Sequence, residues 1–115
     1  MKKLILLWAL GSSIAFGQDF EWAKGIGGDG NDRGNVVRLD PTGNIYIAGA
    51  FSETVDFDPG TGVSNLTSVG EMDLFVAKYD ATGNFLWAKS DGNIYDDLVI
   101  DMAVDASGNA YITGY

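Results

Sequence analysis

The residues of this chain best placed to bind a cation are two carboxylates at alternating positions. Asp56 and Asp58 precede Pro59-Gly60, and alternate side chains of an extended segment point to the same side. Ca²⁺ takes about 6 to 8 oxygen ligands, so backbone carbonyls or water would have to complete its shell. The same residues are also typical of an Asx turn that leads into Pro-Gly. Both interpretations stay open at the level of sequence.

A second candidate for calcium is the glycine-rich stretch 27–32, GGDGND. It is similar to one turn of a calcium-binding nonapeptide, in which glycines permit tight turns and Asp carboxylates reach the ion. Those nonapeptides bind calcium through successive stacked turns. This chain has a single copy, with Gly34 where a large apolar residue is expected. An ordinary interstrand loop is the alternative.

Clustered acids are the remaining residues with catalytic potential. Glycoside hydrolysis uses two carboxylates about 5 to 9.5 Å apart, and Asp96, Asp97 and Asp101 lie close in sequence. With 16 acidic residues in the chain, such clusters arise without any catalytic purpose and favour a solvated acidic face. The chain has no Cys and no His, which excludes thiol nucleophiles, histidine bases and the usual zinc sites. We predict no catalytic residue, no metal site and no cofactor.

Composition and net charge limit the classes of molecule to which this chain could bind. Hydrophobic residues make up 46% of the chain and charged residues 20%, which is typical of a globular protein. The formal net charge of minus 9 opposes binding to nucleic acid and to anionic membranes.

The N-terminus has the pattern of a secretory signal peptide. Lys2 and Lys3 precede the apolar run 4–10, LILLWAL, and Ala15 and Gly17 supply the small residues of a cleavage site. The apolar run is shorter than the roughly 20 residues of a membrane-spanning helix. We therefore expect residues 1–17 to be removed and the protein to be secreted or displayed at the cell surface.

The rest of the chain contains an internal repeat. Residues 20–50 and 85–115 align without a gap at an offset of 65 positions, and 12 of the 31 pairs are identical. Chance alone would give about 2. The mature chain, residues 18–115, is thus a repeat region with a first unit at about 20–84 and a second begun at about 85–115.

A shorter motif, Asp-x-Ser/Thr-Gly-Asn, occurs at 40–44, 80–84 and 105–109. Asp accepts hydrogen bonds from backbone amides two residues on, and Gly takes the left-handed conformation that ends a hairpin loop. Each copy is predicted to be the tip of a β-hairpin.

The flanking segments are rich in β-branched and aromatic residues, and no sustained helical period occurs in the mature chain. We expect strands at about 35–39, 45–51, 73–79, 85–89, 100–104 and 110–114. The stretch 52–72 is longer than an ordinary loop, which indicates local order or function. Four strands for each unit, in tandem copies that cover one another, predict an all-β chain of four-stranded antiparallel meanders. These are β-propeller blades, about one and a half units, in a ring that this chain does not close.

Recurring aromatic residues fit this architecture. Trp22 recurs as Trp87, and Tyr46 recurs as Tyr111. They would stack on sugars if exposed, but their identical places in the repeat favour a role in the core between blades. The two Trp residues are predicted to occupy equivalent positions in consecutive blades.

Several motifs together resemble the bacterial secreted β-propeller repeats called SBBP. They are the Trp-Ala-Lys triplets at 22–24 and 87–89, the loop 27–32, the stretch 40–49, the segment 56–60 and the segment 73–80. The resemblance covers the mature chain and implies repeated blades in a larger extracellular protein with no defined enzymatic activity. The second copy departs from it at 90–95, SDGNIY, which replaces the Gly-Gly loop.

The expected function is therefore that of an exported, noncatalytic propeller segment that acts as a scaffold or binding surface. Its expected partners are further blades of the same longer chain and a protein or carbohydrate ligand. Two alternatives stay open. One is the N-terminal part of a secreted enzyme whose catalytic region lies beyond residue 115, and the other is a calcium-dependent surface module.

Overall fold

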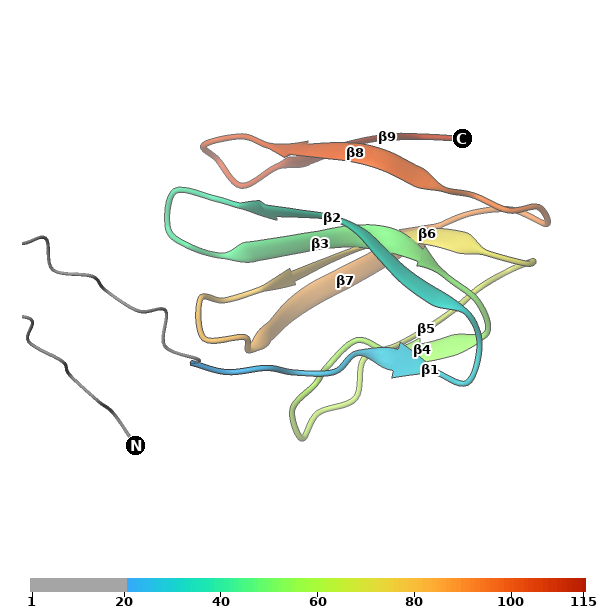
Figure 1. Ribbon diagram of the computed structural model, residues 1–115, viewed down its shortest axis with the longest axis horizontal. Coiled ribbons are helices and arrows are strands. Elements are labelled where there is room, and N and C mark those ends of the chain that lie inside the picture. The colour runs from blue at the N-terminus through green and yellow to red at the C-terminus, as the bar shows by residue number, and fades with distance from the viewer. Residues whose placement is uncertain (1–20) are drawn as a thin grey trace, which may run out of the picture.

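The computed structural model describes residues 21–115, and this part of the chain is all-β (Figure 1). The predicted signal peptide, residues 1–17, lies outside the described residues. In the range from 21 to 115 no helix has the length and apolar content needed to cross a bilayer.

The first unit contains a four-stranded antiparallel meander, as predicted. Its strands are β2 (Asp32–Leu39), β3 (Ile45–Phe51), β6 (Asp73–Tyr79) and β7 (Phe85–Asp91), and they lie in the order β2-β3-β6-β7. The bounds of β3 and β6 are the expected ones, whereas β2 begins earlier and β7 ends later than the sequence indicated.

The second unit begins with β8 (Val99–Val104) and β9 (Ala110–Gly114), which pair antiparallel as a separate two-stranded sheet. These two strands correspond to β2 and β3 of the first unit through the 65-residue offset. No third strand is added to them within residues 21–115, so the second meander is open.

A small third sheet forms where the sequence predicted a long, locally ordered connection. Its strands are β1 (Gly27–Gly28), β4 (Thr54–Asp56) and β5 (Asn65–Thr67), in the order β1-β4-β5. These strands are two or three residues long, too short to show an alternating pattern in sequence. The connection from β3 to β6 is thus ordered by strand pairing.

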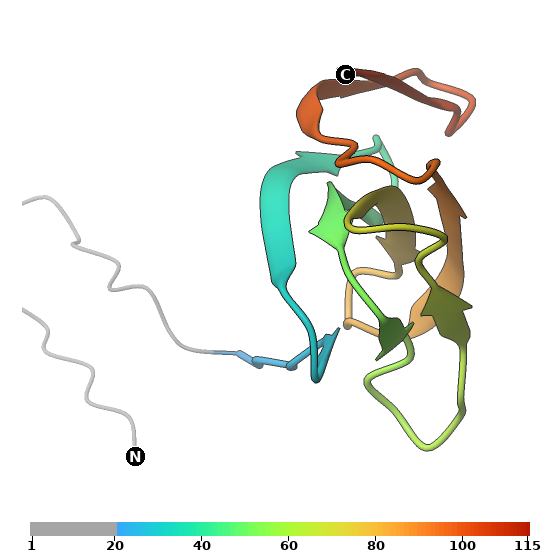
Figure 2. The same cartoon turned by 90° about the vertical axis from the view of Figure 1, so that its right-hand side faces the viewer.

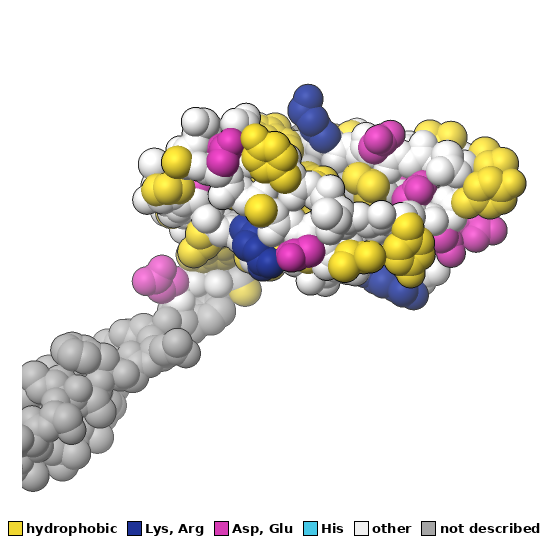
Figure 3. Space-filling model, turned by 90° about the horizontal axis from the view of Figure 1, so that it is seen from above, with side chains coloured by type: hydrophobic (Ala, Val, Ile, Leu, Met, Phe, Trp, Pro, Cys, Tyr) yellow, Lys and Arg dark blue, Asp and Glu magenta, His cyan; other side chains and the backbone are white. Residues whose placement is uncertain are grey.

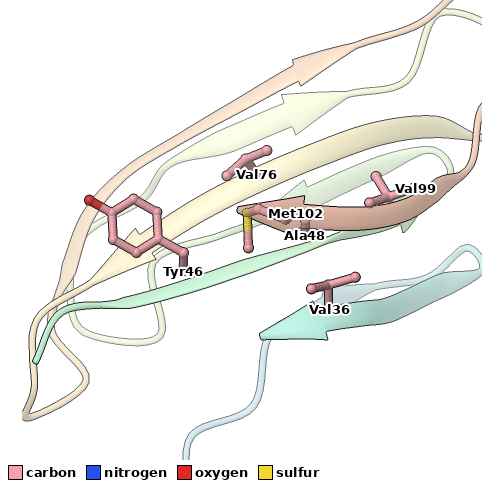
Figure 4. Packing of buried hydrophobic residues seen from close by; sticks show 6 residues of the cluster. All are labelled: Val36, Tyr46, Ala48, Val76, Val99 and Met102. Carbon is pink, nitrogen blue, oxygen red and sulfur yellow. The ribbon is translucent and has the colours of Figure 1, made fainter. Parts of the chain in front are cut away.

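The two faces of the four-stranded sheet pack against different neighbours (Figures 1 and 2). The face toward β8–β9, here called the upper face, carries Val36, Tyr46, Ala48 and Val76. These side chains pack on Val99 and Met102 of β8 (Figure 4). The opposite or lower face carries Phe51, Phe75, Ala77 and Tyr79, which pack on Val55 and Phe57 of the connection. The two central strands, β3 and β6, are therefore covered on both sides.

Trp22 and Trp87 do not occupy equivalent positions, and this prediction was wrong. Trp87 lies in β7 and packs edge-on against Tyr46, with ring centroids 6.1 Å apart. Trp22 lies outside the strands, is 39% exposed and stands over Gly83. Trp87 is held by the pairing of β7 with β6, whereas the segment around Trp22 pairs with no strand within residues 21–115.

Tyr46 and Tyr111 are equivalent in the repeat but differ in burial. Tyr46 is fully buried in the core between the units, as predicted, whereas Tyr111 is 61% exposed. The upper side of β8–β9 has no further sheet packed on it within residues 21–115. The difference therefore follows from what covers each side chain and not from the strands themselves.

Candidate functional site

All three Asp-x-Ser/Thr-Gly-Asn segments are hairpin tips, as predicted. They join β2 to β3, β6 to β7 and β8 to β9. In each turn the Gly amide donates to the carbonyl of the Asp, at 2.9 to 3.0 Å. Gly43, Gly83 and Gly108 have φ of 86°, 83° and 83°, which is the left-handed conformation that side chains with a Cβ disfavour.

The Asp carboxylate organises each turn. Asp40 Oδ1 accepts hydrogen bonds from the amides of Thr42 and Asn44, both at 3.0 Å, and Oδ2 accepts from Asn44 Nδ2 at 2.8 Å. Asp80 and Asp105 repeat this arrangement. Hydrogen bonds from the Asn side chain and the turn amides lower the pKa of all three carboxyls from the ordinary value. These acids are structural acceptors.

A polar cluster joins the first unit to the second. The Tyr46 hydroxyl donates to the carbonyl oxygen of Gly108 at 2.9 Å and lies 3.4 Å from Asp40 Oδ2. Lys78 Nζ lies 3.7 Å from Asp40 Oδ2 and 4.9 Å from the centroid of the Tyr46 ring. The interaction with Tyr46, with a smaller contribution from Asp40, raises the pKa of Lys78. The charged Lys78 is thus favoured at the contact between units.

Two further contacts cross between the units from β2. Asn35 Nδ2 donates to the carbonyl of Val99 at 3.0 Å. Arg38 forms an ion pair with Asp101 at 2.6 Å, although both side chains are about half exposed. An exposed pair of this kind contributes little to stability. Asp101, considered in the sequence as a catalytic acid, is engaged here with Arg38.

The two carboxylates that the sequence suggested as calcium ligands, Asp56 and Asp58, accept hydrogen bonds from backbone amides. Asp56 Oδ1 accepts from the amides of Asp58 and Ser64, at 3.0 and 2.8 Å, and Asp58 Oδ1 accepts from the amide of Gly60 at 2.8 Å. These are the hydrogen bonds of an Asx-type turn. In residues 21–115 no three Asp, Glu, His or Cys side chains come together as a metal-binding group.

The other acidic residues considered in the sequence, in the stretch 27–32 and at 96–97, also lie in loops and form hydrogen bonds there. In the stretch 27–32, Asp32 Oδ2 accepts from the amide of Gly28 at 2.8 Å, and the amide of Asn31 donates to Ser52 Oγ at 2.7 Å. Asp97 Oδ2 accepts from the amide of Asn93 at 2.9 Å. The structure therefore uses these residues to fix loops, and it does not gather Asp96, Asp97 and Asp101 into one group.

The comparisons with known proteins give one similarity. An uncharacterized WD repeat-containing protein, L264 of Acanthamoeba polyphaga mimivirus, is 33% identical over 107 residues. The match covers 81% of this chain and 8% of that protein, so the chain spans only a small part of its relative. No family model and no solved structure matches the chain.

WD repeats form blades of four strands in β-propellers, and the first unit is a four-stranded antiparallel meander. The repeat is β-propeller-like. In these terms, the upper face of the first blade packs on the lower side of the second, and the Tyr46 cluster lies at this contact between blades.

A groove runs along the contact between the blades. It has a volume of about 560 Å³ and is lined by Leu74, Val76 and Trp87 of the first blade and by Ala110 and Ile112 of β9. A smaller cavity of about 250 Å³ lies on the lower face, where Lys24, Asp32 and Arg33 surround apolar walls. The groove lies directly beside the polar cluster at Gly108.

Sequence reasoning did not single out several residues of this site. Lys78 and Asn35 were read only as parts of a strand, because their partners come from distant segments. Asp73 is 2% exposed, and its Oδ2 accepts from the amide of Val69 at 3.0 Å. Its Oδ1 has no hydrogen-bond partner among the described residues and lies against Gly92. No spacing in the sequence marks this burial.

Proposed function

We propose that this chain is an exported, noncatalytic segment of a β-propeller that serves as a scaffold or binding surface. The observation that carries the proposal is the packing of β8–β9 on the upper face of the first blade through Val99 and Met102. Two consecutive units that cover one another in this way are typical of a repeat array, whose stability comes from contacts between neighbours.

The chemistry of the site supports a structural role over a catalytic one. The carboxylates of Asp40, Asp80 and Asp105 accept several hydrogen bonds within their own turns, and Asp101 is paired with Arg38. The similarity to a WD repeat-containing protein supports a scaffold as well. Further blades are the partners that this architecture needs, together with a ligand bound across them. Residues 1–17 and the resemblance to secreted propeller repeats support export to the cell surface.

Stacking of the blades is tested with two substitutions in the same strand. Met102→Asp places a charge in the contact, where Met102 is 2% exposed, whereas Ile100→Asp changes a side chain that is 62% exposed. We expect Met102→Asp to remove the amide hydrogen-exchange protection of residues 99–104, because a buried unpaired charge is strongly unfavourable. Ile100→Asp should leave it in place. Equal protection in both variants would contradict the proposal.

A further inference from the structure

The small sheet on the lower face of the first unit has an unpaired outer edge at β5. Within residues 21–115, β5 pairs with β4 and with no other strand, so it is the outer strand of the order β1-β4-β5 (Figure 2). It lies between β4 and β6 in the chain, so the segments that flank it in sequence are part of the structure. An edge strand presents backbone amides and carbonyls that can pair with another extended segment.

The free backbone groups of this edge belong to Asn65 and Thr67. On the side of β4, the Ser64 carbonyl accepts a backbone hydrogen bond at 3.0 Å, and the Ser68 amide donates one at 2.9 Å. Bonded and non-bonded pairs alternate along an antiparallel ladder, so Leu66, midway between these two serines, also bonds toward β4. The amides and carbonyls of Asn65 and Thr67 therefore point away from β4, to the open side.

The edge of β5 lacks the charged side chains that usually discourage pairing between molecules. Residues 59–70 contain no charged residue, although 20% of the chain is charged. The outer strands of the four-stranded sheet differ in this respect, because β2 carries Arg33 and Arg38 and β7 carries Lys89. The edge of β5 is thus less protected against pairing than the edges of β2 and β7.

Net charge limits where two copies of this chain can meet. The formal net charge is minus 9, and acidic side chains are spread over the face seen in Figure 3. Like charges repel where such surfaces approach one another. The uncharged segment 59–70 adds no repulsion of this kind, so a second copy can approach β5 closely.

The residues around Leu66 are arranged for pairing with themselves. If two copies pair antiparallel about Leu66, Asn65 of one copy lies opposite Thr67 of the other, and these are the two residues with outward backbone groups. Val63 then lies opposite Val69, and these side chains are 74% and 72% exposed. A contact in which the same patch serves both copies closes about one twofold axis.

We propose that the edge of β5 is a contact between two copies of this chain, in which the two β5 strands pair antiparallel about Leu66. Each Asn65 exchanges both backbone hydrogen bonds with the Thr67 opposite, and the small sheets of the two copies join into one. The exposed valines cover one another at both ends of the contact. The contact uses no residue of the packing between the blades, so it is independent of the proposed function.

Sedimentation of the purified chain at increasing concentration measures this association, and we expect an equilibrium between monomer and dimer. Thr67→Lys places a charge on the paired edge and should raise the dissociation constant of the dimer about tenfold or more. The matched control is Thr113→Lys, the same substitution at an exposed position of β9, which should leave the constant unchanged. Circular dichroism verifies the fold of both variants. A monomer at every concentration, or equal weakening by the two variants, would overturn the proposal.

Cysteine cross-linking tests the register of the pairing by a separate measurement. The chain has no Cys, so each substitution introduces a single thiol. A mixture of Asn65→Cys and Thr67→Cys chains should form a disulfide between copies, because directly opposed residues lie about 5.5 Å apart at Cα.

Either cysteine variant alone should cross-link much more slowly. Identical positions are then offset by two residues along the strands, about 8 to 9 Å apart, which exceeds the span of a disulfide. Equal rates in the mixture and in the single variants would contradict pairing about Leu66. Absence of a cross-link in the mixture would contradict the contact itself.

Discussion

The hydroxyl of Tyr46 donates a hydrogen bond of 2.9 Å to the carbonyl of Gly108, which lies 62 residues further along the chain. The donor belongs to β3 of the first blade, and the acceptor belongs to the hairpin tip of the second. Tyr46 is fully buried and the bond itself is partly buried, so it helps to fix how the second blade sits on the first.

Removing the Tyr46 hydroxyl should weaken the contact between the two blades and lower the free energy of unfolding. Tyr46→Phe keeps the ring but leaves the Gly108 carbonyl without its donor, so we expect the free energy of unfolding to fall by about 1 to 2 kcal/mol. Urea denaturation measures this free energy of unfolding. The matched control is Tyr111→Phe, whose hydroxyl bonds only to the exposed turn of its own hairpin. A loss as large in the control would show that the bond between blades is not the cause.

The turn glycines should differ in their tolerance of a side chain. Gly43 and Gly83 both have positive φ, so Ala at either position is expected to cost about 1 to 2 kcal/mol in backbone strain. At position 83 a Cβ would also lie 2.9 Å from the Trp22 ring, whereas at position 43 its nearest neighbour is 3.6 Å away.

We therefore expect Gly83→Ala to lower the melting temperature more than Gly43→Ala. Asn tolerates the left-handed conformation, so Gly43→Asn should recover part of the loss. Equal melting temperatures for the two Ala variants would show that the contact of Trp22 with the turn does not add to the cost.

Acid should weaken the fold through the turn carboxylates. Hydrogen bonds hold the pKa of Asp40, Asp80 and Asp105 below the ordinary value of 3.8. A carboxyl with a lower pKa in the folded state stabilises that state above its unfolded pKa, and the stabilisation is lost as the pH falls below it. The free energy of unfolding should therefore drop between about pH 4 and the lower folded-state values.

The variant Asp80→Asn tests the source of that drop. It removes one of the three titrating turns, so its loss of stability between pH 7 and pH 3 should be smaller than that of the parent chain. Asp96→Asn is the control, because the exposed Asp96 carboxylate accepts no hydrogen bond from residues 21–115. Urea denaturation at the two pH values gives the comparison, and an unchanged drop in Asp80→Asn would rule out the turn carboxylate.

The exported protein is expected to begin at Gln18. Ala15 and Gly17 occupy the two positions that the signal peptidase reads, so the mature chain should lack residues 1–17 and carry a formal charge of minus 11, because Lys2 and Lys3 are removed. Intact-mass analysis of the exported protein gives the answer directly. A secreted species that retains Met1 would exclude cleavage.

Titration with calcium should show no saturable heat of binding at Asp56 and Asp58. Each carboxylate already has one oxygen bonded to backbone amides, and no third acidic residue joins them within residues 21–115. Titration calorimetry of the parent chain and of Asp58→Asn makes the measurement. A binding heat that the substitution abolishes would favour the calcium-dependent surface module.

The sequence predicts the longer strands of this fold well, because the residues that favour a strand lie within the strand itself. Segments such as Ile45–Phe51 and Asp73–Tyr79 carry enough β-branched and aromatic residues to mark a strand, and each turn motif marks where the chain reverses. The short strands β1, β4 and β5 were missed, because two or three residues carry no period and their pairing depends on distant segments.

The polar site was predicted less well. The turn acids were recognised because their hydrogen bonds lie within five residues, whereas Lys78 meets Asp40 only after β2, β3 and β6 have paired. The expected equivalence of Trp22 and Trp87 failed for the same reason. Identical residues in a repeat acquire identical surroundings only where neighbouring strands are also repeated.

The contact between the blades joins two different surfaces, the upper face of one unit and the lower side of the next. Insertion of a whole 65-residue unit would keep an upper face opposite a lower side, because β8 and β9 take in the second unit the places that β2 and β3 take in the first. A gain or loss of a single residue within a strand would instead turn its apolar side chains to the opposite face. Packing between units therefore tolerates the addition of a whole unit better than the addition of one residue inside a strand.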